Sequence, residues 1–480
     1  MDTTGAGATC IIDRDGIIVW ASPEFTGLFA HRAGPIGMPF SQLFAGVTDV
    51  CRPGAQLEDR DRAGRKRYFR AECRRESNAR GDRVSDVVVL RDVTLPKLLG
   101  DLSRLATQPG TAKALFEKSL LLIKDSCGYL GLAGFIIRDT SVSVTCGSEL
   151  ELIASKGWTE KLKSMVRVVP IAPDAPAMSG RAAYHRAQMV TTLGEYGLMK
   201  SVKDAIERIG GEFLVVTPLI DHERLVGVLT VIHDRGLSPE ELDTLQAIGG
   251  QLAVSLDVKV QEEELTRRSE DAALAADLLA HEVALHGAVI RAWAEDPGDE
   301  AAGECALKAL ALNDEVALDA GELGASSRPG RPLPLAEVVD QAVEDARLFA
   351  GLSGRQIAVT VKLADESTAV GPLLRYALRN LLVNSAKHGM KSSVDVTVRS
   401  SVDRSGARKI EVADNGPGIA EELKSGVFRR EGHGGKVTGL SLAKRIVNRY
   451  GGRIWIEDRV PGNPAKGARV VITLPPASSR

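Results

Sequence analysis

The sequence predicts a multidomain α+β protein with several separate cores. The chain has 480 residues, roughly three times the length of a typical domain. β-rich and helical patterns alternate along it, which favours mixed layers of helix and sheet. In addition, a helical pattern runs from Ser238 to Trp293 with hardly a breaker. A helix of this length is typical of a coiled coil or a helical bundle.

Charge and composition exclude several classes of protein. The chain has 61 basic and 63 acidic residues, a formal net charge of −2, and shows no basic face for nucleic acid. The longest uncharged apolar stretch, Gly128 to Ile137, is far shorter than the roughly 18 residues of a membrane helix. The N-terminus lacks a signal-peptide pattern. We therefore expect a soluble, cytoplasmic protein with neither nucleic acid nor membrane as a partner.

The six cysteines are scattered and form no CxxC pair. This spacing indicates neither a zinc site nor a disulfide framework. We expect reduced thiols in the cores.

Residues 1–95 read as a small sheet. A turn at Asp13 to Gly16 separates two apolar runs, which is a hairpin signal. Further strands are expected at 65–73 and 85–94, and a short helix at 23–30. This order of strands, small helices and strands resembles a PAS sensor domain.

Residues 100–257 form a second expected unit. The sequence predicts a helix at 111–130, strands at 132–139 and 149–158, and two β-rich runs joined by a turn at Asp221 to Arg224. Ser238 then provides an N-cap, with Glu241 at the capping-box position. The whole looks like a GAF domain.

Both resemblances imply an unknown small-molecule or redox signal, because PAS and GAF domains commonly enclose a ligand or chromophore. If that group were a haem or bilin, it would need a His or Cys ligand. His31, His185 and Cys127 are the nominal candidates.

Residues 258–325 read as a helical hairpin. Leu274, Leu278, Leu285 and Ala288 lie near heptad spacing, with His281 in the gap, and a second helical run follows at 301–323. One hairpin would expose too much apolar surface, so two are expected to form a four-helix bundle in a homodimer. The segment 324–334, rich in Ser, Gly and Pro, is the clearest linker.

Residues 332–480 mix helices at 335–352, 373–389 and 440–451 with five strands. They predict an α/β sandwich with helices on one face of a sheet.

Three motifs in this domain contain residues suited to ligand binding. DNGPGI (414–419) follows a strand, so its glycines permit close approach of a ligand and its Asp414 can accept a hydrogen bond from an exocyclic amine.

The second motif, RNLLVNSAKHG, places Asn380 and Asn384 four residues apart on one helical face, with Lys387 on the next turn. Amide oxygens suit Mg²⁺, and a lysine suits phosphate. The third is the Gly-rich stretch 431–447, where amides of Thr438, Gly439 and Leu440 open a helix and favour phosphate.

Taken in chain order, the motifs at 379–389, 414–419 and 431–447 resemble the N, G1 and G2 boxes of sensor histidine kinases of two-component systems. The ATP-binding domain of these kinases is of the GHKL type. The resemblance implies ATP and Mg²⁺ as cofactors. Asn384 would hold the metal, Asn380 and Lys387 would face the phosphates, and Asp414 would read adenine. Gly416, Gly418 and Gly439 would shape the lid. Val437 and Ser441 replace glycines of the usual G2 box, which bears on lid closure and the rate of phosphoryl transfer.

His281-Glu282 stands where such kinases carry their phospho-acceptor pair. The imidazole would attack the γ-phosphate, while Glu282 accepts the ring proton and orients the tautomer. His286 is a competitor, but no acid follows it.

We therefore expect a homodimeric sensor histidine kinase that passes a phosphoryl group to the aspartate of a cognate response regulator. Two alternatives remain open. One is a degenerate, ATP-binding signalling scaffold without autokinase activity, which the altered G2 box favours. The other is a non-kinase ATPase of the same group, which is disfavoured because those enzymes carry a catalytic glutamate where this chain has Asn380.

Overall fold

The computed structural model divides the chain into two compact units, Met1–Glu264 and Leu265–Arg480. The described residues are 7–30, 34–44, 51–52, 55–61, 64–137, 148–194, 200–295, 300–325, 332–352, 355–389, 393–403, 406–424, 426–428 and 438–476. Several features named above lie outside them: His31, Val437, most of the turn at 295–300 and the middle of the linker, 326–331.

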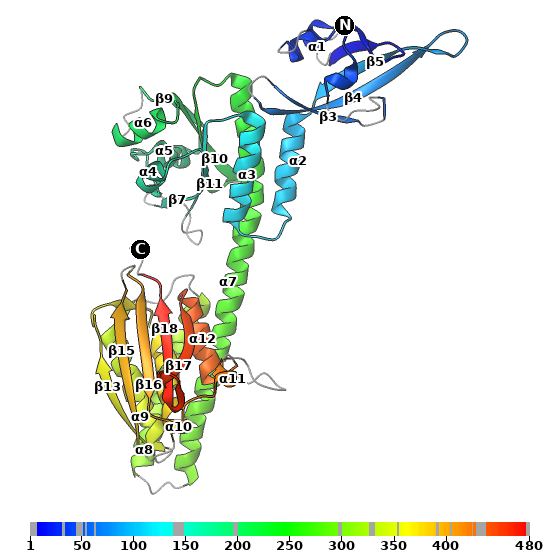
Figure 1. Cartoon of the computed structure of the whole chain (residues 1–480). Coiled ribbons are helices and arrows are strands. Elements are labelled where there is room, and N and C mark those ends of the chain that lie inside the picture. The colour runs from blue at the N-terminus through cyan, green and yellow to red at the C-terminus, as the bar shows by residue number, and fades with distance from the viewer. Residues whose placement is uncertain are drawn as a thin grey trace. The chain divides into compact units, whose positions relative to one another are not determined.

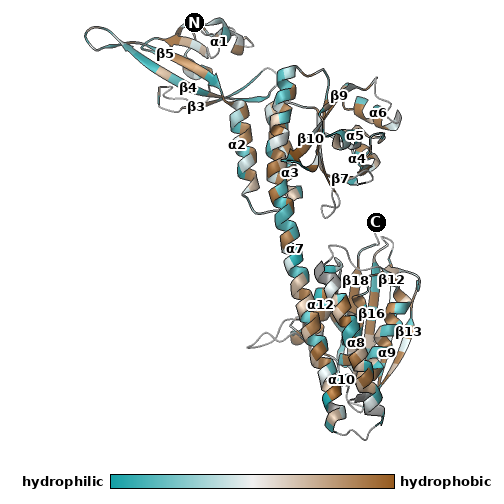
Figure 2. Cartoon of the chain, turned by 180° about the vertical axis from the view of Figure 1, so that it is seen from behind, coloured by the Kyte–Doolittle hydropathy of each residue, from teal (hydrophilic) through white to brown (hydrophobic). Residues whose placement is uncertain are grey.

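The N-terminal domain is an antiparallel sheet with the strand order β2-β1-β5-β4-β3 (Figure 1). Its elements are β1 (Ala8–Ile12), β2 (Ile18–Ala21), α1 (Pro23–Leu28), the 3₁₀ turn η1 (Phe40–Gln42), β3 (Gln56–Arg60), β4 (Lys66–Ser77) and β5 (Arg83–Asp92). The predicted hairpin is confirmed: Gly16 has φ +81°, and the Asp13 carboxylate accepts from the Ile17 amide at 2.9 Å. The far end of the β4–β5 hairpin is hydrophilic in Figure 2, in keeping with its charged sequence.

The second domain is a six-stranded sheet, ordered β8-β7-β6-β11-β10-β9, between two helical layers. Its elements are α2 (Thr94–Ala106), α3 (Ala112–Cys127), β6 (Gly131–Ile137), β7 (Glu149–Lys156), α4 (Glu160–Met165), β8 (Val168–Pro170), α5 (Met178–His185), β9 (Met189–Thr192), α6 (Lys200–Glu207), β10 (Phe213–Asp221) and β11 (Arg224–His233). Helices α2, α3 and the start of α7 (Pro239–Glu295) cover one face, and α4 to α6 cover the other. Because both faces are covered, β11 is buried along nearly its whole length.

Helix α7 (Pro239–Glu295) begins at the predicted cap and continues slightly beyond the predicted end. The Ser238 amide donates to Glu241 at 2.9 Å, and the Glu241 amide donates back to the Ser238 hydroxyl at 3.3 Å. Helix α8 (Glu300–Ala325) follows. By length and composition α7 is long and apolar enough to cross a membrane, as are core helices of many soluble proteins.

The C-terminal domain is a five-stranded sheet, ordered β13-β15-β16-β18-β17, with β13 parallel to β15 and the other pairs antiparallel (Figure 1). Its elements are β12 (Leu333–Pro334), α9 (Leu335–Leu352), β13 (Gln356–Lys362), β14 (Ala369–Val370), α10 (Leu374–His388), β15 (Ser393–Val402), β16 (Arg408–Asp414), α11 (Glu421–Lys424), α12 (Gly439–Arg449), β17 (Arg453–Val460) and β18 (Asn463–Leu474). Helices α9, α10 and α12 share one core with the sheet, as the sequence predicted.

The heptad positions do not form a continuous exposed seam. Leu274 and Leu278 are buried in the core that contains α9, α10 and α12, whereas Ala288 is exposed. Exposed apolar residues of the hairpin lie elsewhere, at Leu265 and Val283 among others. The bundle of two hairpins stays a prediction; within one chain, Leu274 and Leu278 pack in a core that also contains Val316 and Ala320 of α8.

The expectation of reduced thiols is wrong for one pair, since Cys51 and Cys73 form a disulfide with their Cα atoms 4.9 Å apart. The two residues are 22 positions apart in sequence, so no CxxC spacing could signal them. Among the described residues, Cys10, Cys127 and Cys305 are free thiols.

Candidate functional site

Helix α10 presents the predicted amides and lysine on successive turns. Asn380 is 4% exposed, and its Nδ2 has no hydrogen-bond partner among the described residues. Asn384 is half-buried and Lys387 is exposed. A buried amide without a partner costs free energy, so the Asn380 side chain is suited to a polar ligand that supplies the missing bond.

Asp414 ends strand β16 and is held from two sides. Its Oδ1 accepts from the Gly416 amide at 2.9 Å and from the Ala468 amide at 3.2 Å. Its Oδ2 accepts from the Ser385 hydroxyl of α10 at 3.2 Å. The side chain remains partly exposed. A fixed carboxylate that is still open to solvent can accept a hydrogen bond from a ligand amine.

Two glycines of the motifs lie close against their neighbours. Gly418 has φ +72°, and a Cβ there would lie 1.6 Å from the Pro464 carbonyl oxygen. At Gly439, the first residue of α12, a Cβ would lie 3.1 Å from the Asn380 side-chain oxygen. The start of α12 therefore approaches α10 beside Asn380, and the structure brings motifs two and three together.

Ser441, one of the departures from the usual G2 box, caps α12. Its hydroxyl accepts from the Thr438 amide at 3.0 Å, and its own amide donates to the Thr438 hydroxyl at 3.2 Å. This reciprocal pair is a capping box. The Thr438 amide, predicted to favour phosphate, is therefore engaged by a side chain. The helix start at Gly439 and Leu440 keeps the positive end of the helix dipole.

The donor set fits ATP with Mg²⁺. Asp414 offers a carboxylate for an exocyclic amine, Asn380 offers an unpaired amide nitrogen, and Asn384 offers a neutral oxygen of the type that Mg²⁺ accepts. Lys387 is exposed on the adjoining turn, where an ammonium group can reach phosphate.

His281 lies on α7 with its side chain 17% exposed. Its Nδ1 is 3.1 Å from Oε1 of Glu282. When Nδ1 carries the proton and donates it to the carboxylate, the lone pair remains on Nε2. This is the tautomer that a nucleophilic histidine needs.

Glu282 is fully buried and forms an ion pair with Arg379 of α10. Burial raises the pKa of Glu282, but the Arg379 charge and hydrogen bonds from His281 and Arg379 lower it by more, to about 2. A carboxylate of this pKa is a poor proton acceptor near neutral pH. The geometry thus fits the predicted orienting role of Glu282 better than its predicted role as a proton acceptor.

His286, the competing acceptor, is fully buried. Its Nδ1 donates to the Asn313 side-chain oxygen at 2.6 Å, and its ring stacks on Phe349 with centroids 5.5 Å apart. Burial lowers the pKa of His286, which the Asn313 hydrogen bond and the Glu282 charge only partly oppose. A packed, neutral ring in this position is not accessible to a nucleotide.

Arg379 is the functional residue that the sequence reasoning missed. It is 1% exposed and its guanidinium carbon lies 5.4 Å from the Phe349 ring centroid. The sequence feature that could have identified it is an arginine in an apolar helix directly before Asn380. A buried charge needs a partner, so this arginine predicts an acidic residue nearby.

Further ion pairs fix the hairpin against the C-terminal helices. Arg449 of α12 pairs with Asp271 of α7 at 2.5 Å. Arg375 of α10 pairs with Glu315 and Asp319 of α8 at 2.9 and 3.2 Å. His281 and the three motifs therefore belong to one packed unit.

The nominal haem and bilin ligands do not converge in the described residues. His185 ends α5 and is exposed, whereas Cys127 ends α3 and has a pKa raised by burial to about 11. His31 lies outside the described residues.

Comparisons with known proteins agree with this geometry. Residues 369–478 match the family of histidine kinase-, DNA gyrase B- and HSP90-like ATPases, and residues 142–256 match the GAF domain. Sensor histidine kinase AruS of Pseudomonas aeruginosa is 37% identical over 98 residues, 18% of this chain and 10% of AruS. The histidine-protein kinase/phosphatase MprB of Mycobacterium ulcerans is 33% identical over 179 residues, 34% of this chain and 32% of MprB.

A solved structure of the mycobacterial sensor histidine kinase MprB is 26% identical and covers 30% of this chain and 95% of that chain, with a TM-score of 0.27. The chain thus spans about a tenth of AruS and a third of MprB from Mycobacterium ulcerans. The chain carries a GAF domain and a histidine kinase-type ATPase domain, and it is a relative of the sensor histidine kinases.

Proposed function

We propose that the protein is an ATP-dependent sensor histidine kinase that phosphorylates His281 and passes the phosphoryl group to the aspartate of a cognate response regulator. One observation carries this proposal. Arg379 and Asn380 are successive residues of α10. Arg379 forms the ion pair that holds Glu282 beside His281. Asn380 has the unpaired amide nitrogen, and its side chain lies next to Gly439 at the start of α12. The acceptor and the nucleotide motif are therefore joined through one helix.

The residues divide the chemistry between them. Bound Mg-ATP would supply the γ-phosphoryl group. Glu282 holds the Nδ1 proton of His281, which leaves Nε2 as the nucleophile and stabilises the ring as it gains positive charge. Asp414 would orient the adenine of bound ATP, Asn384 would hold Mg²⁺, and Asn380 and Lys387 would bind the phosphates. Gly439 and Leu440 provide the helix start.

A homodimer would cover the exposed apolar face of the hairpin. Leu265 and Val283 are 66% and 57% exposed and stand 18 residues apart, about five helical turns. On α8, Leu307, Leu310 and Leu318 are 69%, 50% and 70% exposed. Large exposed apolar faces mark interfaces, and a second copy of the hairpin would bury these residues in a four-helix bundle.

The two N-terminal domains would sense a signal. The five-stranded antiparallel sheet with α1 beside it supports the assignment of residues 1–95 as PAS-like, and the GAF match lies within 100–257. Residues 258–325 would be the dimerisation and phosphotransfer region, and residues 332–480 the ATP-binding domain. We further propose that the protein acts in the cytoplasm, with neither a membrane nor nucleic acid as a partner.

The experiment is to incubate the full-length protein with Mg²⁺ and γ-labelled ATP. A phosphohistidine is labile to acid and stable to alkali, so label with these properties on wild type but not on His281→Gln is the expected result. ATP binding without label would support the second candidate, a signalling scaffold, which the replaced glycine at Ser441 favours. Steady ATP hydrolysis without label would indicate a non-kinase ATPase.

A further inference from the structure

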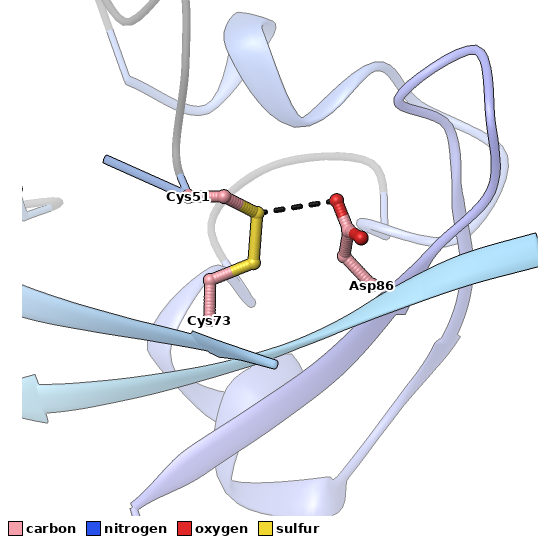
Figure 3. Close-up of side chains that lie close together, drawn as sticks. All are labelled: Cys51, Cys73 and Asp86. Atoms are coloured by element: carbon pink, nitrogen blue, oxygen red, sulfur yellow. Dashed lines mark hydrogen bonds between the residues drawn. A yellow bond between two sulfur atoms is a disulfide. The ribbon is translucent and has the colours of Figure 1, made fainter. Parts of the chain in front are cut away.

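Three reactive side chains of the N-terminal domain come together outside the kinase machinery. Cys51 lies before β3, Cys73 lies in β4 and Asp86 lies in β5. In Figure 3 the two sulfurs are bonded and the Asp86 carboxylate points at Cys51. The Cys51 Sγ is 3.1 Å from Oδ2 of Asp86.

Asp86 occupies a core position of its strand. Asp86, Val88 and Leu90 are every second residue of β5 and are 0%, 0% and 1% exposed, so all three face the core. At such a position an apolar side chain is expected, but Asp86 has a carboxylate. Burying a carboxylate is costly unless it is paired. Arg83 pairs with it at 2.5 Å and Arg75 lies 3.6 Å away.

The Asp86 carboxylate lies where it can act on the Cys51 sulfur. In the disulfide, Cys51 has no proton, so its contact with Asp86 becomes a hydrogen bond from the sulfur only when Cys51 is a thiol. The nucleophile in thiol chemistry is the thiolate. Asp86 is therefore placed to hold the thiol proton while Cys51 attacks and to pass it to the departing thiolate, so that the ion pairs of the carboxylate with Arg83 and Arg75 are restored after the step.

We propose that Cys51 and Cys73 are a reversible dithiol/disulfide couple, a redox site in which Asp86 positions and transfers the Cys51 proton. With a low-molecular-weight disulfide RSSR as oxidant, the Cys73 thiolate attacks one sulfur, forms a mixed disulfide and releases RS⁻. Cys51, deprotonated by Asp86, then attacks the Cys73 sulfur and expels the second RS⁻. Each RS⁻ takes up one thiol proton, so two protein thiols and RSSR become one protein disulfide and two RSH.

Both cysteines are half-buried, which leaves them reachable for a small disulfide. The bond ties the segment before β3 to the middle of β4, across 22 residues of sequence. Oxidation and reduction thus give this domain two covalent states. The same three residues could also hold a metal ion, but the ion pair with Arg83 already engages the carboxylate.

The test equilibrates the full chain in buffers of varied ratio of reduced to oxidised glutathione, alkylates free thiols and identifies the peptides by mass spectrometry. We expect Cys51 and Cys73 to convert together, reversibly, to one internal disulfide, while Cys10, whose pKa is raised to about 12 by burial, stays a thiol. The proposal would be overturned if Cys51 and Cys73 stayed oxidised at every glutathione ratio. It would also be overturned if mixed disulfides with glutathione formed but were never replaced by the internal Cys51–Cys73 disulfide. Stoichiometric zinc that is bound by the reduced protein and lost in Cys51→Ser would overturn it as well.

Two variants test the role of Asp86. Asp86→Asn should slow closure of the disulfide by roughly tenfold or more, because a positioned proton acceptor is lost. Asp59→Asn removes another buried carboxylate of the same sheet and should leave the rate near that of wild type. Equal slowing in both variants, or none in Asp86→Asn, would remove Asp86 from the mechanism. Cys51→Ser/Cys73→Ser gives the fold control by thermal unfolding. None of these readouts depends on the proposed kinase activity.

Discussion

The Arg379 guanidinium and the Glu282 carboxylate form an ion pair in which both side chains are at most 1% exposed. Arg379 belongs to the helix that carries Asn380 and Asn384, and Glu282 belongs to the helix that carries His281. The pair therefore links the two halves of the proposed reaction. It also keeps Glu282 ionised, which fixes the hydrogen bond to His281.

Breaking this pair should destabilise the C-terminal unit. Removing one partner of a buried pair leaves the other charge unpaired, and we expect Arg379→Met to lose roughly 3–5 kcal/mol of unfolding free energy. Hydrogen exchange of the peptide that covers α10 is the measurement. Arg91→Met, which removes an exposed pair with Glu72, is the control and should change little. Equal exchange in both variants would contradict the buried role.

The same pair predicts a pH dependence. The folded-state pKa of Glu282 is lowered to about 2, below its unfolded value near 4.5. Its stabilisation is therefore complete above about pH 4.5 and is lost as the pH falls through that window towards 2. In Glu282→Gln, protection of the α10 peptide should be lower at neutral pH and should fall less between pH 5 and pH 3. Parallel curves for wild type and variant would show that the pair does not contribute.

Asn384→Ala should abolish Mg-ATP binding with little loss of fold, because the amide oxygen is the proposed metal ligand on a half-buried face of α10. Isothermal titration calorimetry measures the affinity. Asn448→Ala, an exposed asparagine on α12, is the matched control. The assignment fails if both variants bind Mg-ATP as wild type does.

His281→Gln should remove all autophosphorylation, whereas His286→Gln should keep most of it. Glu282→Gln should slow the step by roughly 10² or more, since the hydrogen bond that sets the tautomer is weakened. Because His286 packs on Phe349 and Asn313, His286→Gln is expected to lower the melting temperature as well. Initial rates with γ-labelled ATP give the readout, and label that persists in His281→Gln would place the acceptor elsewhere.

Leu285 lies one helical turn after His281, at a position where sensor histidine kinases that also dephosphorylate their partner usually carry Thr or Asn. Its isobutyl group packs with Val289, Ala309 and Phe349 and cannot hold the water that attacks a phospho-aspartate. We expect a net kinase, with Leu285→Thr gaining phosphatase activity. Incubation with ADP and phosphorylated regulator measures this. Acceleration of dephosphorylation by about tenfold or more in wild type would contradict it.

The sequence by itself determined most of the local structure, because the signals involved are local. The cap at Ser238, the hairpin at Gly16 and the helix that carries Asn380 and Asn384 follow from neighbouring residues. The three motifs were also recognisable, since each is a short run of neighbouring residues. Ser441 could be identified as a departure, but its cap on Thr438 could not, because the first turn of α12 had to be placed first.

Only the tertiary structure decided which residues meet across long separations. Arg379 and Glu282 are 97 positions apart, and Cys51 and Cys73 are brought together by the pairing of β3 with β4, which no residue spacing encodes. Leu274 and Leu278 have the spacing of a bundle seam, yet they pack with the C-terminal helices. The physical reason is that hydrophobic periodicity fixes which face of a helix is buried but not its partner, because burial of apolar area is non-directional.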